Sequence, residues 1–162
     1  MKKLKIAFLV LGGVFLAIQF FGPVKTNPTT DPAQSAYHTL EMPPAVTAAL
    51  QRSCNDCHSN DTRWPWYTSV APVSWWTIDH VNHGRSHLNF SEWGKLSTEN
   101  AMHTLTDICE EIESGAMPLP SYLRMHGGAR LSLEDRKNIC LWTVAQRNKL
   151  SGKSDAGHGE HR

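Results

Sequence analysis

The segment 54–58, "CNDCH", is the feature that most restricts what this chain can fold into. On one helical turn Cys54 and Cys57 are three residues apart and His58 follows directly, so all three side chains can point to the same side. Two cysteines at this spacing can add to the two vinyl groups of a haem, while the adjacent imidazole coordinates the iron. The motif therefore predicts a domain built around covalently attached haem c, with Cys54 and Cys57 as attachment residues and His58 as an iron ligand.

Other uses of the cysteines fit the sequence less well. A thioredoxin-like dithiol expects a βαβ context, and no run of alternating apolar residues indicates a strand. A structural zinc site needs a second close pair of ligands, whereas Cys109 and Cys140 are far apart in the sequence. In an oxidising compartment these two cysteines either form a disulfide, which we favour, or remain buried free thiols.

The first 25 residues, 1–25, form a segment of their own. "MKKLK" is positively charged, and the run "IAFLVLGGVFLAIQFFG" that follows is apolar except for Gln19. Such a segment is either an uncleaved membrane anchor or a cleaved secretory signal, and the bulky residues at its end favour the anchor. Because the lysines stay in the cytoplasm, both interpretations place the rest of the chain in the periplasm or outside the cell, at a bacterial inner membrane if the anchor is retained.

The rest of the chain reads as one small folded domain. The formal net charge is +1 and no basic face stands out, so nucleic acid is not an expected partner. Residues 26–40 are polar and read as a linker, 41–150 form the domain, and 151–162 are predicted to be a flexible tail.

The signals within the domain are helical. Prolines, a Ser97 cap, a capping box from Ser132 to Asp135, and the glycines Gly84 and Gly115 mark helix ends. They predict helices over residues 44–58, 73–84, 98–114 and 133–150. The expected fold class is all-α, a small cytochrome c-like helical domain.

Aromatic residues and a methionine complete the expected haem site. Trp64, Trp66 and Tyr67 follow the motif closely and are predicted to wall the macrocycle against water. Met117 stands between Gly115, which ends a helix, and Pro118, which keeps Met117 out of helical dihedrals. We therefore predict Met117 as the second iron ligand, with Met125, a histidine or an open position as the alternatives.

Other polar residues near the expected site are open to more than one use. His80, His83 and His87 would share one helix face, either as a solvated surface, which we favour, or as an accessory metal site or an iron ligand. An arginine could pair with the haem propionates, and the candidates are Arg63, Arg85 and Arg130. No catalytic residue is predicted.

Four stretches between His38 and Trp142, "CNDCHSNDTRWPWY", "VAPVSWW", "DHVNHGRSHLNFSEW" and "EEIESGAMPLPSYLRMH", follow one another in this order. Together they resemble the bacterial haem-binding domain family of cytochrome c type. The resemblance implies covalent haem c and, by analogy with monohaem cytochromes, supports Met117 as the second ligand. The positions that match its pattern are Cys54, Cys57, His58, Trp64, Pro65, Trp66, Tyr67, Asn89, Phe90 and Trp93.

These features lead to one expected function. The chain is predicted to be a membrane-tethered, exported monohaem cytochrome c that carries single electrons between redox partners and is not an enzyme. A haem domain with an open distal position, used for ligand sensing or for peroxidase-like chemistry, is the alternative.

Overall fold

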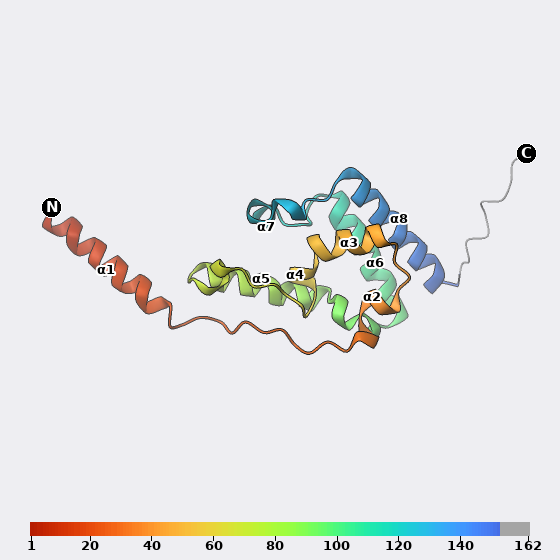
Figure 1. The fold of residues 1–162 in the computed structure, drawn as a ribbon, viewed down its shortest axis with the longest axis horizontal. Coiled ribbons are helices and arrows are strands. Elements are labelled where there is room, and N and C mark those ends of the chain that lie inside the picture. The colour runs from red at the N-terminus through yellow and green to blue at the C-terminus, as the bar shows by residue number, and fades with distance from the viewer. Residues whose placement is uncertain (153–162) are drawn as a thin grey trace, which may run out of the picture.

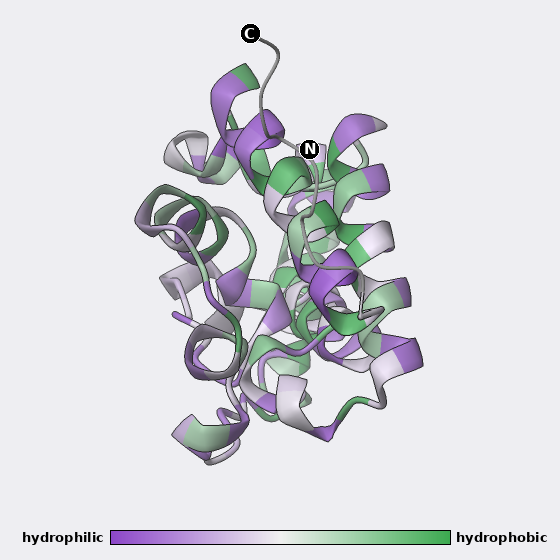
Figure 2. Ribbon diagram, turned by 90° about the vertical axis from the view of Figure 1, so that its right-hand side faces the viewer, coloured by the Kyte–Doolittle hydropathy of each residue, from purple (hydrophilic) through white to green (hydrophobic). Residues whose placement is uncertain are grey.

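The computed structural model describes residues 1–152, and this part of the chain is all-α, without strands (Figure 1). The predicted fold class is confirmed at this level, while residues 153–162 of the expected tail lie outside the described residues. Hydrophobic and hydrophilic residues are mixed along the helices (Figure 2), as amphipathic helices require. In chain order the elements are α1 (Lys2–Ile18), η1 (Pro32–Gln34), α2 (Ala36–Thr39), α3 (Pro44–Ser53), α4 (Asn55–His58), η2 (Trp66–Ser69), α5 (Val73–His87), η3 (Phe90–Lys95), α6 (Thr98–Glu113), α7 (Pro120–Met125), η4 (Gly127–Ala129) and α8 (Leu133–Leu150).

The hydrophobic core lies where α3, α6 and α8 meet. α8 packs against both α6 and α3. Leu50 of α3, Leu105 of α6 and Ile139 of α8 have no exposed surface, and Phe90 and Trp93 of η3 join the same cluster. α4 carries the "CNDCH" motif away from this core and packs on α5.

The ends of the long helices follow the local sequence. Ser97 accepts a hydrogen bond from the Asn100 amide at 3.2 Å, and Ser132 and Asp135 form the reciprocal capping box. Gly115 follows α6 with a φ of 76°, a left-handed conformation that glycine adopts without steric cost. The helices predicted over residues 98–114 and 133–150 are confirmed.

Two predicted boundaries are wrong, and one helix was not predicted. The helix expected over 44–58 is broken at Cys54, whose φ of −122° separates α3 from α4. α5 does not end at Gly84 but continues to His87. Gly84 lies inside the helix, where its backbone closely approaches Cys57. α7 begins at Pro120, a residue type favoured at the first helical position, between the predicted helices over 98–114 and 133–150.

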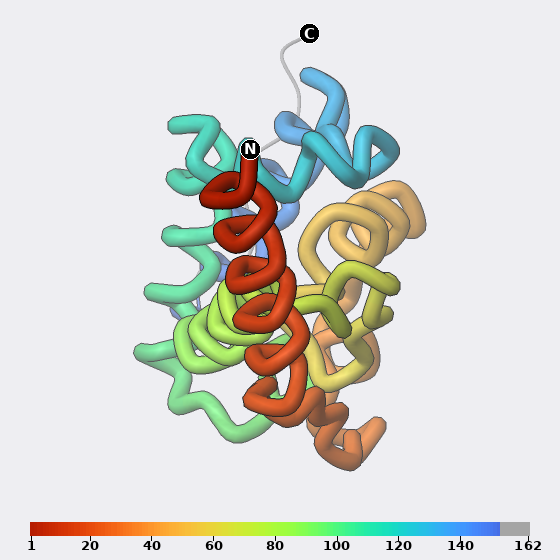
Figure 3. The backbone as a smooth tube through the Cα atoms, turned by 90° about the vertical axis from the view of Figure 1, so that its left-hand side faces the viewer, coloured from red at the N-terminus to blue at the C-terminus, as the bar shows by residue number. Residues whose placement is uncertain are grey.

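The N-terminal region runs along the domain. Among residues 1–152, no helix combines the length and the apolarity that crossing a membrane demands. α1 stands to one side, and an extended stretch leads from it to η1 (Figures 1 and 3). Gln19 exchanges two hydrogen bonds with the backbone of Ala71, and Trp75 donates its indole N–H to the Phe21 carbonyl at 2.7 Å. Ala36, within the segment expected to be a linker, is fully buried in the core.

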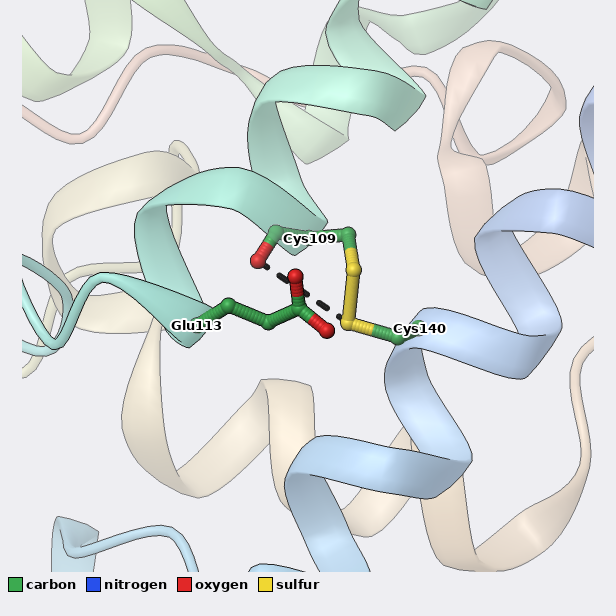
Figure 4. Close-up of side chains that lie close together, drawn as sticks. All are labelled: Cys109, Glu113 and Cys140. Atoms are coloured by element: carbon green, nitrogen blue, oxygen red, sulfur yellow. Dashed lines mark hydrogen bonds between the residues drawn. A yellow bond between two sulfur atoms is a disulfide. The ribbon is translucent and has the colours of Figure 1, made fainter.

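A disulfide between Cys109 and Cys140 ties α6 to α8 (Figure 4), with the two Cα atoms 5.0 Å apart. Of the two states considered for these cysteines, the structure has the bridge. The Glu113 carboxylate lies beside the two sulfur atoms. Because the sulfurs are bonded to each other, neither is a thiolate that could hold a metal ion with Glu113.

Candidate functional site

The "CNDCH" motif forms a single turn. The amides of Cys57 and His58 both donate to the Cys54 carbonyl, at 3.2 and 2.9 Å. The two cysteines of the motif are free thiols, in contrast to Cys109 and Cys140. The turn therefore presents two thiols and an imidazole together.

The His58 ring is held by two backbone carbonyls. Its Nδ1 lies 3.0 Å from the Gly84 oxygen and 3.1 Å from the Leu88 oxygen, so Nδ1 carries the proton and donates to them. This tautomer leaves the Nε2 lone pair for a metal, the usual arrangement of a ligating histidine. Burial lowers the pKa of His58, which favours the neutral ring that a metal requires.

Gly84 lets α5 approach this turn closely. A Cβ atom at Gly84 would stand 2.7 Å from the Cys57 carbonyl oxygen, closer than such atoms approach. The glycine thus allows its own carbonyl to reach His58. An isolated glycine inside a helical pattern is a signal of such close approach, but sequence reasoning had assigned Gly84 to the helix end.

Both thiols of the motif are uncharged at neutral pH. Burial, reinforced by the neighbouring Cys57, raises the pKa of Cys54 to about 12. Burial and the charge of Asp56 raise the pKa of Cys57 to about 11. A redox-active dithiol needs a cysteine of lowered pKa, so these environments argue against that use of the pair.

Two hollows adjoin the turn. The first, here called the histidine hollow, has a volume of about 470 Å³ and lies between α4, α5, α6 and the segment after α6. Cys54, Cys57 and His58 line it, and Met117 lines it from the segment after α6. The structure thus brings the two predicted iron ligands and the two predicted attachment cysteines into one cavity.

The second, here called the tryptophan hollow, has a volume of about 280 Å³ and an almost wholly apolar lining. Trp64, Trp66 and Tyr67 all line it, although Trp66 is 75% exposed. The two hollows share the lining residues Cys57, His80, Leu119 and Tyr122, so they adjoin across this edge of the motif.

Met117 is positioned by the end of α6. Its amide donates to the Glu111 carbonyl at 3.0 Å, two residues after the left-handed Gly115. The side chain is half-buried. Met125, the alternative ligand, is 62% exposed and lines the tryptophan hollow, which does not include His58. Of the two methionines, only Met117 shares a cavity with His58.

Asp56, which sequence reasoning did not single out, links the two sides of the site. It is 8% exposed and accepts hydrogen bonds from the Tyr122 hydroxyl at 2.8 Å and from Arg63 Nε at 3.1 Å. Burial, together with this bond to Asp56, raises the pKa of Tyr122. Tyr122 belongs to α7, so the bond joins the segment that follows Met117 to the motif. No spacing in the sequence indicates this pair.

The three arginines considered for the propionates differ in their partners. Arg63 is paired with Asp56. Arg85 donates to the Ser59 carbonyl at 2.7 Å and makes further bonds along the N-terminal stretch. Arg130 is exposed and lines a separate hollow on the other side of Met117. Arg63 and Arg85 are therefore engaged by the protein itself.

The residues of the histidine hollow fit a haem. Its volume is within the range of small-molecule sites, roughly 300–1,000 Å³. An imidazole with a free Nε2, a thioether and two free thiols line it together. The buried Ser53 hydroxyl, also on its wall, has no hydrogen-bond partner among residues 1–152. This donor set, soft sulfur with imidazole, is one that haem iron accepts.

A helical domain in which a histidine, a methionine and two free thiols line one cavity has the side chains that a metal-bearing cofactor needs. A family model described as "Haem-binding domain" matches residues 13–145, most of the chain. The chain belongs to this haem-binding domain family, and haem is the cofactor that the family assigns. No curated protein and no solved structure matches it.

Proposed function

We propose that this protein is an exported monohaem cytochrome c that carries single electrons between redox partners. The observation that carries the proposal is the histidine hollow, in which His58, with its Nε2 free, and Met117 line the same cavity as two free cysteines. When bound, haem supplies a one-electron iron couple. Histidine–methionine ligation raises the potential of that couple relative to bis-histidine ligation and leaves no open position for catalysis.

The chain's own residues have distinct roles in this proposal. Cys54 and Cys57 would hold the haem by thioether bonds, each formed by addition of the thiol S–H across one vinyl group, which needs no oxidant. The Gly84 and Leu88 carbonyls orient His58. The aromatic residues of the tryptophan hollow exclude water from the edge beside Cys57.

Export is supported by two features. The lysine-rich start and the apolar helix α1 together have the pattern of a signal segment, cleaved or retained as a membrane attachment. The disulfide between Cys109 and Cys140 is typical of an oxidising compartment such as the periplasm. Sequencing the N-terminus of the mature protein distinguishes a cleaved segment from a retained one.

Optical spectra of the haem-loaded protein test the ligands. In wild type we expect a low-spin haem with a ferric methionine–iron charge-transfer band. Met117→Ala should lose this band and become able to bind carbon monoxide or cyanide readily. Met125→Ala is the matched control and should keep the wild-type spectrum, because Met125 lies outside the histidine hollow.

A high-spin wild-type spectrum would contradict electron transfer and favour a sensing or peroxidase-like function instead. Loss of the band in Met125→Ala but not in Met117→Ala would move the second ligand to the other methionine. Extraction of the haem by acidified organic solvent separately tests attachment, since thioether-bound haem stays with the protein.

A further inference from the structure

We propose that His83 and His87 form a binding site for a divalent transition-metal ion. They line the histidine hollow but are not among the four residues proposed to attach and ligate haem. The two side chains lie one turn apart on α5, and their Nε2 atoms are 3.2 Å apart. Both are exposed. The proposal is independent of the electron-transfer function, because it uses neither the cysteines nor the two proposed iron ligands.

The separation of the two nitrogens is that of a chelate. Zinc binds imidazole nitrogen at about 2.0–2.1 Å, so two such ligands at angles of about 90–109° stand roughly 2.9–3.4 Å apart. The observed 3.2 Å lies within this range. At this separation one ion can reach both Nε2 atoms.

The two imidazole rings are not held by other hydrogen-bond partners within residues 1–152. Within residues 1–152, neither imidazole makes a hydrogen bond except to the other. His80, which the sequence pattern grouped with them, is different. It packs against Trp76 in a tilted arrangement, with ring centroids 4.3 Å apart, and its Nδ1 donates to the Trp76 carbonyl at 2.8 Å. Of the three histidines that the sequence grouped as a solvated face or an accessory metal site, only His83 and His87 pair with each other.

The surroundings favour a cation. Asp107 and Glu111 of α6 line the same histidine hollow as His83 and His87, and both acidic side chains are exposed. Their negative charge raises the local concentration of cations. Imidazole ligands suit Cu²⁺, Ni²⁺ and Zn²⁺, with Cu²⁺ the strongest of these. Water would complete the coordination of an ion held by two protein ligands.

The test titrates the haem-loaded full chain with metal ions. His158→Ala and His161→Ala are introduced in every sample, so that the tail histidines do not bind the probe. Calorimetry with Ni²⁺ and Zn²⁺ should show one saturable ion per chain. Electron paramagnetic resonance with one equivalent of Cu²⁺ should show nitrogen ligation.

Single substitutions then assign the site. Loss of a supporting group around a metal costs 10–100-fold in affinity, so loss of a ligand in His83→Ala or His87→Ala should weaken binding by about tenfold or more. His38→Ala is the matched control, since His38 is also exposed and lies on α2. It should bind like the parent.

Three outcomes would overturn the proposal: no saturable binding in the parent, unchanged binding in both His83→Ala and His87→Ala, or an equal loss in His38→Ala. Circular dichroism and an unchanged haem spectrum check that each variant is folded and keeps its iron ligands. A haem spectrum that changes with added metal in the parent, and also in His83→Ala and His87→Ala, would mean that the ion binds at the haem ligands and would likewise overturn the proposal.

Discussion

At the scale of single residues, Gly84 shows how the site depends on a missing side chain. Alanine is the better helix former by about 1 kcal/mol. At this position, however, its Cβ would lie 2.7 Å from the Cys57 oxygen and 3.3 Å from the Cys57 Cβ. The backbone of the motif and that of α5 cannot both stay in place around such an atom. The close contact outweighs the helix propensity.

We predict that Gly84→Ala destabilises the haem-loaded protein by about 1–3 kcal/mol, the usual cost of overpacking. Urea unfolding followed by helix content measures the change. Gly128→Ala is the control, because a Cβ there meets nothing within 4 Å, and it should stay within about 0.5 kcal/mol of wild type. A neutral or stabilising Gly84→Ala would show that α5 can move away from the motif without cost.

Single residues of the site differ in how far the sequence predicts them. Cys54, Cys57 and His58 were predictable because their spacing alone brings them onto one turn. The carbonyl partners of His58 lie 26 and 30 residues away, and no local pattern encodes them. The role of Asp56 likewise depends on Tyr122, which is 66 residues distant. Hydrogen-bond partners so far apart in the sequence are brought together by tertiary packing.

At the scale of elements, the start of α8 joins local capping to a tertiary contact. Asp135 accepts hydrogen bonds from Ser132 and also forms an ion pair with Arg52 of α3 at 2.6 Å. The Ser132 hydroxyl and amide, with Arg52 nearby, lower the pKa of Asp135. One carboxylate therefore caps the start of α8 and holds the helix against α3.

We predict that Asp135→Asn costs about 0.5–1 kcal/mol at pH 7, the range for helix-terminal charges and exposed ion pairs. Since the folded pKa is below the unfolded value of about 3.9, the contribution is complete above that value and is lost as the pH falls through the folded pKa. Urea unfolding at pH 7, 5 and 3 should show the same difference at the first two and a smaller one at pH 3.

Glu134→Gln removes the same charge from the same turn and is the control. Glu134 is exposed and has no hydrogen-bond partner for its side chain within residues 1–152. If the two variants lose equal stability, the bonds of Asp135 contribute nothing beyond its charge.

Elements with local signals were predictable, and those shaped by packing were not. Ser97 and the box from Ser132 to Asp135 begin their helices as the sequence indicates, because a cap needs only residues three positions away. The break at Cys54 falls among residues of low helix propensity, Ser53, Asn55 and Asp56, but no side chain caps the start of α4 to mark it. α7 has only six residues, too few for a periodic pattern.

At the scale of the whole molecule, the disulfide between Cys109 and Cys140 closes a loop of 31 residues between the two longest helices of the domain. The chain-entropy relation for a loop of this length gives about 3–4 kcal/mol. We predict that the double variant Cys109→Ala, Cys140→Ala loses about this much free energy of unfolding, measured with urea on the haem-loaded protein.

Reduction distinguishes the effect of losing the disulfide from the effect of replacing the two cysteine side chains. A thiol reductant should lower the stability of wild type toward that of the double variant and leave the double variant itself unchanged. If neither reduction of wild type nor the double substitution lowers the free energy of unfolding, α6 and α8 are held together by packing alone.

The overall fold class was the most predictable property, since long amphipathic runs without strand-like alternation leave only helices. The path of residues 19–31 along the domain was not predictable. This stretch mixes apolar and polar residues and contains prolines. It follows the domain through individual bonds such as those from Gln19 to Ala71. Such contacts involve few residues and leave no periodic trace in the sequence.

The bond from Tyr122 to Asp56 has a consequence for electron transfer in the proposed carrier. The motif that presents His58 and the segment that follows Met117 are joined by a part-buried hydrogen bond at the wall of the cavity. This bond restrains the movement of one relative to the other. If the two iron ligands keep the same separation in both oxidation states, few atoms have to move when an electron arrives or leaves. Low reorganisation energy would then be a property of the scaffold around the iron as much as of the iron itself.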